Sequence, residues 1–170
     1  MGGAWIGRVR HSLTYGWELD PMNKAFVKEP EFDGRAYCTR CGQLGIAVQA
    51  VTLDAFVQPE VRGDLGDDAW FCGFGRCDVA YFDLFESTIT IDRLIRSVYP
   101  MDLKAPICGC FGLQMSDIEE DVSEGHPTRL RELAERSDSD EARCQSAAAD
   151  GRCCMQEAQR IYFRLRGGVG

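Results

Sequence analysis

The sequence predicts an α+β fold, in which a small antiparallel sheet is followed by two or three helices. Short runs of aromatic and β-branched residues bounded by glycine, at residues 70–72 and 78–82, are typical of strands. After residue 110, capping residues precede apolar positions at helical spacing. With 170 residues, the chain can form one domain with an additional arm.

The first half of the predicted domain consists of strands and turns. Gly42 and Gly45 favour a turn, and Thr52 is expected to cap a brief helix that includes Leu53 and Phe56. Proline and glycine among polar residues predict a loop over residues 58–68. The predicted strands are residues 46–51, residues 70–72, residues 78–82 and a segment within residues 94–99.

The second half predicts helices. Residues 116–119 have the form of a capping box, and Pro127 with Thr128 is a typical helix start. A third helix is expected from about residue 155 to residue 165, with apolar side chains on one face. The polar residues 137–140 predict a break between the last two helices.

The net charge of −8 argues against a nucleic-acid partner, because 27 carboxylates against 19 cationic residues repel a phosphate backbone. We expect no membrane span, since no run approaches the roughly 18–20 apolar residues that one requires. The N-terminus lacks the apolar core of a secretory signal, so we expect a cytoplasmic protein. A cysteine-rich sequence in a reducing compartment is more often metal-binding than disulfide-bonded, and nine cysteines cannot all pair.

Residues 1–37 contain no cysteine and carry more large apolar residues than a solvated tail usually has. We therefore divide the chain into an N-terminal arm, residues 1–37, and a metal-binding domain, residues 38–170. The arm either packs on its own domain or docks another protein.

The first four cysteines predict a zinc site. Cys38 and Cys41 form a C-x-x-C pair, and Cys72 and Cys77 form a second pair beside predicted strands. Two such pairs on turns can close four thiolates into a tetrahedron around zinc, which makes the site structural because no position stays open. A thioredoxin-like redox motif and reduced core cysteines are the alternatives.

The last five cysteines predict a [2Fe–2S] cluster. They are Cys108, Cys110, Cys144, Cys153 and Cys154. Iron–sulfur clusters accept irregular ligand spacing because the inorganic core sets the sulfur positions. We expect Cys108, Cys110, Cys144 and Cys154 as ligands, with Cys153 as the alternative fourth ligand. The helix expected after Cys154 favours that residue, since its N-terminal dipole would point at the sulfurs. A second zinc site remains the alternative.

In this order, the motifs resemble the cysteine-rich N-terminal domain of archaeal CopZ-type copper chaperones. The resemblance extends from Cys38 to about residue 165. Its motifs are Cys38-x-x-Cys41-Gly42, Val48-x-x-x-Thr52, Phe71-Cys72, Cys77-Asp78-Val79-Ala80-Tyr81-Phe82, Cys108-Gly109-Cys110-Phe111-Gly112, Asp117-Ile118, and Cys144 followed by Gly151-Arg152-Cys153-Cys154.

The resemblance implies a zinc ion on the first four cysteines, a [2Fe–2S] cluster on the later set, and a role in copper handling through reduction of Cu(II) to Cu(I). The 170 residues contain no ferredoxin-like domain with its own copper-binding C-x-x-C. We therefore expect the two metal centres to carry over from the family, and not copper carriage itself.

These observations predict a small electron-transfer protein with no catalytic residues of its own, whose acidic surface steers it toward a basic protein redox partner. The alternative is an accessory iron–sulfur subunit of a larger complex, anchored through residues 1–37. Delivery of iron–sulfur clusters or copper is a third interpretation.

Overall fold

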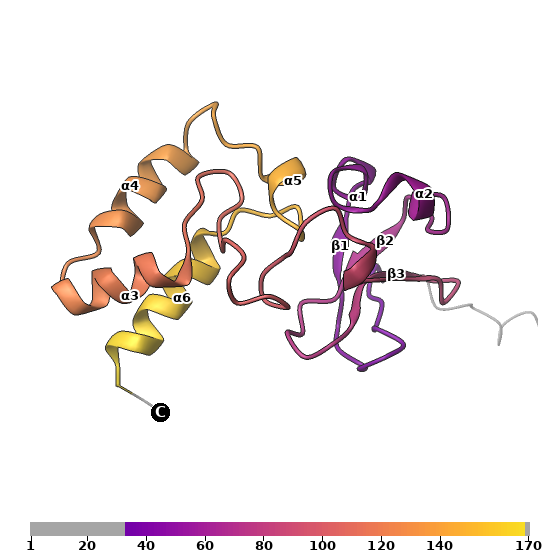
Figure 1. Cartoon of the computed structure of the whole chain (residues 1–170), viewed down its shortest axis with the longest axis horizontal. Helices are drawn as coiled ribbons and strands as arrows, with labels where there is room; N and C mark the ends of the chain where they lie inside the picture. The colour runs from indigo at the N-terminus through magenta and orange to yellow at the C-terminus, as the bar shows by residue number, and fades with distance from the viewer. Residues whose placement is uncertain (1–32, 169–170) are drawn as a thin grey trace, which may run out of the picture. The chain divides into compact units, whose positions relative to one another are not determined.

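The computed structural model describes residues 33–168 (Figure 1). Along the chain its elements are β1 (Ile46–Val48), α1 (Ala50–Phe56), α2 (Pro59–Arg62), β2 (Ala69–Phe71), β3 (Val79–Asp83), β4 (Thr88–Thr90), the 3-10 helix η2 (Ile91–Arg93), α3 (Met115–Glu124), α4 (Thr128–Ser137), α5 (Cys144–Ala147) and α6 (Met155–Arg166). The expectations for the arm, including its docking role, fall almost wholly outside the described residues.

The four strands form one antiparallel sheet in the order β1-β2-β3-β4, which confirms the predicted α+β class. In β2 and β3, Trp70 is opposite Phe82 and Phe71 is opposite Tyr81. A register shift between Val79 and Tyr81 interrupts the pairing of β3 with β4. Such an irregularity changes which face the side chains before it occupy.

The two faces of the sheet carry different cores. Ala69, Phe71 and Tyr81 belong to a cluster with Leu53 and Phe56 of α1. The cluster on the other face contains Ala36, Cys38, Trp70, Cys72, Cys77, Val79 and Phe82. The register shift beside Val79 places this side chain on the same face of the sheet as the cysteines, so this face packs against them.

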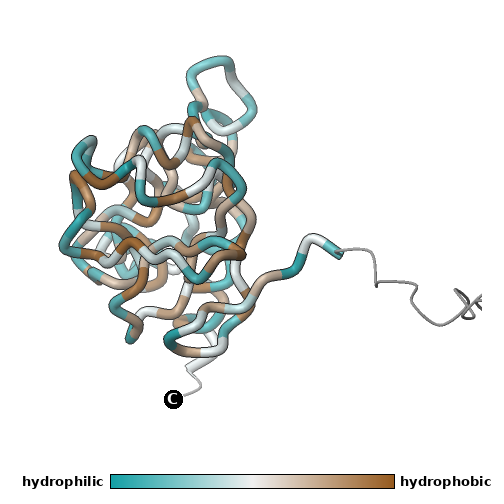
Figure 2. The backbone as a smooth tube through the Cα atoms, turned by 90° about the vertical axis from the view of Figure 1, so that its right-hand side faces the viewer, coloured by the Kyte–Doolittle hydropathy of each residue, from teal (hydrophilic) through white to brown (hydrophobic). Residues whose placement is uncertain are grey.

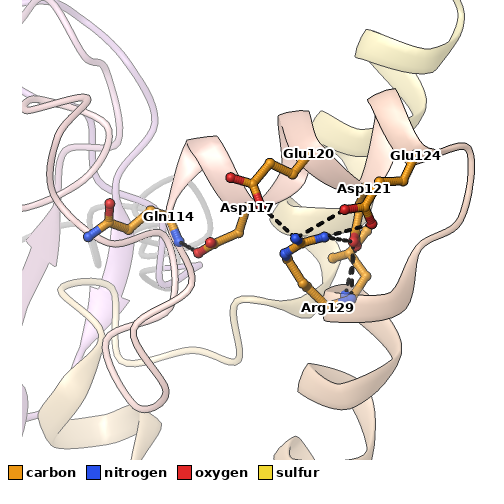
Figure 3. A network of polar contacts seen from close by, with 7 residues as sticks. Gln114, Asp117, Glu120, Asp121, Glu124 and Arg129 are labelled. Atoms are coloured by element: carbon orange, nitrogen blue, oxygen red, sulfur yellow. Dashed lines mark hydrogen bonds and ion pairs between the residues drawn. The ribbon is translucent and has the colours of Figure 1, made fainter.

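The helical half has a separate core, in which α3, α4 and α6 pack around Ile118, Leu133 and Ile161. Asp121 on α3 is fully buried and accepts hydrogen bonds from the backbone N–H groups of Arg129 and Leu130 at the start of α4. Figure 3 shows the Arg129 guanidinium among carboxylates of α3. This network fixes the angle between the two helices.

The segment from Cys144 to Cys154 crosses back to the sheet half. The Thr52 hydroxyl donates to the Gln145 carbonyl at 2.6 Å, and the Tyr81 hydroxyl donates to the Ala149 carbonyl at 2.8 Å. Arg96 donates to the Ser146 carbonyl at 3.0 Å. Side chains of the sheet half therefore hold the backbone that carries Cys144.

The hydropathy of the residues differs between the packed body and its projecting loop. Figure 2 shows apolar stretches in the packed body, whereas the projecting loop after α4 is hydrophilic. Among residues 33–168, no helix combines the length and the apolar character that a bilayer crossing requires.

Several predicted elements are correct. The strands around residues 70–72 and 78–82 correspond to β2 and β3, and the third helix corresponds to α6. The helix start at Pro127 and Thr128 is confirmed, and α4 ends at Ser137.

Other predictions are wrong. Residues 94–99 form no strand: Leu94 makes an isolated bridge with Val57, and the neighbouring strand is instead β4. Thr52 does not cap α1, because that helix begins at Ala50 and shortens β1 to three residues. The capping box of α3 joins Gln114 and Asp117, two residues before the predicted one. Within the predicted loop 58–68, Pro59 opens the short α2.

Candidate metal centres

The first four cysteines converge on one point. One ligand atom from each of Cys38, Cys41, Cys72 and Cys77 lies within 4.8 Å of the other three. The Cys38 and Cys77 sulfurs are 3.9 Å apart, and the Cys41 and Cys72 sulfurs are 3.5 Å apart. With Zn–S bonds near 2.3 Å, the sulfurs of a tetrahedral zinc are about 3.8 Å apart. The donor set therefore fits zinc.

Two turns place these sulfurs. The Gly42 N–H donates to the Cys38 carbonyl at 2.8 Å, and Gly42 has φ of +71°, a conformation that favours glycine. Cys72 follows β2 and its N–H donates to the Ala80 carbonyl, while Cys77 precedes β3. The sheet thus aligns the second turn with the first.

Backbone amides point at three of the sulfurs. The N–H groups of Gln43, Phe74 and Val79 hydrogen-bond with Cys41, Cys72 and Cys77 respectively. Burial raises the pKa of the Cys72 and Cys77 thiols. Burial acts in the same direction at Cys41, but the Gln43 amide and the neighbouring thiols lower its pKa overall. Buried thiols whose pKa values are raised resist losing their protons in the absence of a metal. A bound cation that replaces the protons stabilises the thiolates and, with them, the folded site.

The later cysteines lie near one another in a row, and Cys108 interacts with both Cys154 and Cys110. The Cys110 and Cys144 sulfurs are 3.8 Å apart, and the Cys108 and Cys154 thiols hydrogen-bond with each other. Within the described residues, these cysteines form no group of three whose sulfurs all approach within 4.8 Å. Cys153 is exposed at the surface.

The turn that carries Cys108 repeats the backbone geometry of the turn that carries Cys38. The Gly112 N–H donates to the Cys108 carbonyl at 2.8 Å, and Gly112 has φ of +77°. The N–H of Cys108 donates to a carbonyl five residues later, as does the N–H of Cys38. Amides of Cys110 and Phe111 hydrogen-bond with the Cys108 sulfur. This second knuckle is therefore also built to hold a sulfur among N–H donors.

Gly109 lets the second knuckle approach α5 closely. A Cβ at this position would lie 1.8 Å from the Ala147 carbonyl oxygen. Because Cys110 follows Gly109 and Cys144 begins α5, this contact sets the separation of that sulfur pair.

Three thiols of the second set have shifted pKa values. The hydrogen bond with Cys154 lowers the pKa of Cys108 to about 6, and amides of the knuckle act in the same direction. Burial raises the pKa of Cys144 to about 12, and the bond with Cys108 raises the pKa of Cys154.

Comparison with known proteins agrees with this geometry. Residues 35–95 match the family model zf_CopZ, which is described as a zinc binding domain. Over these residues the chain is similar to that zinc binding domain. The crystal structure of the Archaeoglobus fulgidus CopZ N-terminal domain has the same fold, with a TM-score of 0.63 and 21% sequence identity over 74% of this chain and 97% of that chain. No curated protein matches the chain.

The CopZ-type resemblance stated from the cysteine motifs is thereby confirmed, as is zinc as a cofactor of the first cysteine group. Sequence reasoning missed the side chains that hold the Cys144 segment, namely Thr52, Tyr81 and Arg96. No local pattern marks them, because each donates to a carbonyl about 50 or more residues away.

Proposed function

We propose that this protein is a small electron-transfer protein, in which zinc stabilises the sheet half and a [2Fe–2S] cluster is bound by Cys108, Cys110, Cys144 and Cys154. The observation that carries the proposal is that the later thiols lie near one another, yet no three of their sulfurs among the described residues come within 4.8 Å of one another. A cluster with two irons needs two thiolates on each iron, whereas a single zinc needs four mutually close sulfurs.

The choice of Cys154 over Cys153 rests on position. Cys154 is partly buried against Cys108 and stands at the N-terminal boundary of α6, whereas Cys153 is exposed. The α6 N-terminus contributes partial positive charge near the Cys154 sulfur, which favours a negatively charged ligand set. Cys153 is then free of metal.

A [2Fe–2S] cluster bound by these cysteines would supply one-electron chemistry. The chain's own residues would hold the cluster and adjust its reduction potential. Amides of Cys110 and Phe111 would hydrogen-bond with the Cys108 sulfur, which favours the reduced form of a cluster by stabilising added negative charge. Cys110 and Cys144 are each partly exposed, so that corner of the site is open to a partner.

The partner we propose is a basic redox protein, because the chain carries a net charge of −8. The protein itself would be a carrier and not an enzyme. Copper handling follows from the CopZ-type match, and Cu(II) would then be a one-electron acceptor that leaves as Cu(I).

The test is anaerobic purification of the full chain, followed by elemental analysis, visible absorption and EPR of the dithionite-reduced sample. We expect one zinc and two irons per chain, with an S = 1/2 signal that disappears on oxidation. A preparation reconstituted with iron and sulfide that holds two zincs and no iron would contradict the proposal. Stoichiometric Cu(I) formation on mixing reduced protein with Cu(II) would support the copper assignment.

A further inference from the structure

Two of the later thiols are both close to each other and accessible from solvent. The Cys110 and Cys144 sulfurs are 3.8 Å apart, and both side chains are partly exposed. A disulfide has a sulfur–sulfur bond of about 2.05 Å, so these two sulfurs would have to approach by about 1.8 Å to form one. Each sulfur lies one rotatable bond from its backbone, and small rotations of both side chains produce a movement of this order.

The backbone holds these two cysteines beside each other. Gly109 directly precedes Cys110, and a Cβ added to this glycine would lie 1.8 Å from the Ala147 carbonyl oxygen. Cys144 is the first residue of α5, the same short helix that contains Ala147. Side chains of the sheet half donate hydrogen bonds to carbonyls of this segment. The folded chain therefore gives the two thiols a high effective concentration, which favours a reaction between them over reactions with separate molecules.

The other cysteines are less suited to forming a disulfide. Cys108 is only 2% exposed, so an oxidant reaches it poorly although its thiol hydrogen-bonds with Cys154. Cys153 and Cys154 are consecutive, and Cα atoms about 3.8 Å apart across one peptide are closer than the roughly 4.4–6.8 Å of ordinary disulfides. The four sulfurs of the first centre are occupied when zinc is bound.

A surface hollow gives small molecules access to Cys110. The hollow has a volume of about 460 Å³ and is lined by Cys110, Phe111, Arg136, Asp140, Glu141 and Arg143. Arg143 directly precedes Cys144, so the hollow is next to both cysteines of the pair. Its volume is in the range of about 300–1,000 Å³ that is typical of small-molecule sites. A low-molecular-weight disulfide can therefore reach the Cys110 sulfur.

We infer that Cys110 and Cys144 form a reversible disulfide in the iron-free chain, and that this disulfide is a redox switch for metal loading of the second centre. The oxidant is a low-molecular-weight disulfide. One cysteine sulfur attacks it and releases one small thiol, and the other cysteine sulfur then attacks the mixed disulfide and releases the second small thiol. Two protein S–H groups become one S–S bond, and the two small thiols carry away the two protons.

The disulfide has two consequences for the chain. It removes two of the four thiolates that the [2Fe–2S] cluster requires, and this role as a switch is the only part of the inference that rests on the proposed function. Cys110 and Cys144 are 34 residues apart in the sequence, and the segment between them contains α3 and α4. Closing a loop of this length restricts the unfolded chain and should raise Tm by roughly 5–15 °C.

The test is oxidation of the full, zinc-loaded and iron-free chain in an anaerobic buffer rich in glutathione disulfide. The remaining thiols are then alkylated, and the peptides are mapped by mass spectrometry. We expect a dominant linkage between Cys110 and Cys144, complete reversal by excess reduced glutathione, and an unchanged zinc content. A map dominated by another pairing, or by glutathione attached to Cys153 without an internal disulfide, would overturn the inference.

Cys110→Ser should abolish the internal disulfide and the rise in Tm. Cys153→Ser is the matched control and should keep both, because Cys153 is exposed but takes no part in the linkage. Equal behaviour of the two variants would count against the assigned pair. The peptide map of the unsubstituted chain decides the linkage even where a variant folds poorly.

Reconstitution with iron and sulfide separates the switch from the proposed function. Iron uptake by the reduced chain but not by the oxidised chain would support the switch, whereas equal uptake by both would refute it. If neither form takes up iron, the proposed function fails and the switch fails with it, while the disulfide itself still stands or falls on the peptide map.

Discussion

Replacing Gly109 with alanine tests whether the close approach of the second knuckle to α5 positions the later sulfurs. The added methyl carbon would lie 1.8 Å from the Ala147 oxygen and 2.7 Å from the Ala147 carbonyl carbon. Both are backbone atoms, so no rotamer change relieves the clash, and Cβ contacts under 3.0 Å essentially never occur. The two backbones must therefore separate by about 1 Å or more.

This separation has a cost in stability and a cost in geometry. Overpacking of this kind costs about 1–3 kcal/mol, which lowers Tm by about 4 °C per kcal/mol for a domain of this size. The Cys110 and Cys144 sulfurs, now 3.8 Å apart, would move beyond the separation of about 3.8 Å that one tetrahedral metal imposes. Zinc binding should remain, because the four sulfurs of the first centre belong to other segments.

The assay compares Gly109→Ala with Gly63→Ala. Gly63 has ordinary φ of −72° and nothing within 4 Å of an added Cβ, so its variant should behave like the parent. We expect Gly109→Ala to keep one zinc, to melt several degrees lower, and to lose most visible absorption after reconstitution with iron and sulfide. A Gly109→Ala protein that melts like the parent and keeps its iron would refute the argument that this contact sets the sulfur spacing.

Three further predictions concern single side chains. Cys72→Ser should lose the zinc and much of the stability, as measured by elemental analysis and thermal melting, because a closed structural site contributes folding energy directly; retained zinc would contradict this. Cys154→Ser should bleach a reconstituted protein while Cys153→Ser keeps most of the absorption, and the opposite result would reverse the ligand assignment. Burial opposes ionisation of Asp121, but the amides of α4 and the Arg129 guanidinium hold its pKa below the usual range of an aspartate. A lowered folded-state pKa gives stability that is full above the unfolded-state pKa and lost as pH falls through the folded-state pKa. Asp121→Asn should thus cost about 1–3 kcal/mol at pH 7 and show a weaker acid dependence, as measured by urea unfolding between pH 7 and pH 3; an unchanged midpoint would contradict the role of this cap.

The strands beside the cysteines could be predicted because their signals are local. Residues 79–83 are all buried, so a continuous apolar run bounded by a turn identifies them. The spacing of Cys38 with Cys41, and of Cys72 with Cys77, likewise reports on single turns. Convergence of the two turns then follows from the antiparallel pairing of β1 with β2, which the structure shows and the strand signals alone did not specify.

The errors come from segments whose conformation is set by distant contacts. Leu94 and Val98 are buried and look strand-like, but the chain there only bridges once to Val57 before turning away. Threonine is a common helix-capping residue, yet the Thr52 hydroxyl donates to the backbone carbonyl of Gln145, 93 residues away. The four-residue helix α5 has no periodicity that a sequence could reveal, because a single turn spans less than one repeat.

The same long-range contacts imply an order of dependence between the two centres. Cys144 belongs to a segment whose carbonyls accept hydrogen bonds from Thr52, Tyr81 and Arg96 of the sheet half. The first centre draws all four of its cysteines from residues 38–77, so it can close without the helical half. We therefore expect the later sulfur geometry to depend on the sheet half, because hydrogen bonds from Thr52, Tyr81 and Arg96 hold the backbone around α5. Zinc therefore acts on the second centre through the fold, and a variant that loses zinc should lose the later sulfur geometry as well, whereas loss of a later cysteine should leave the first centre intact.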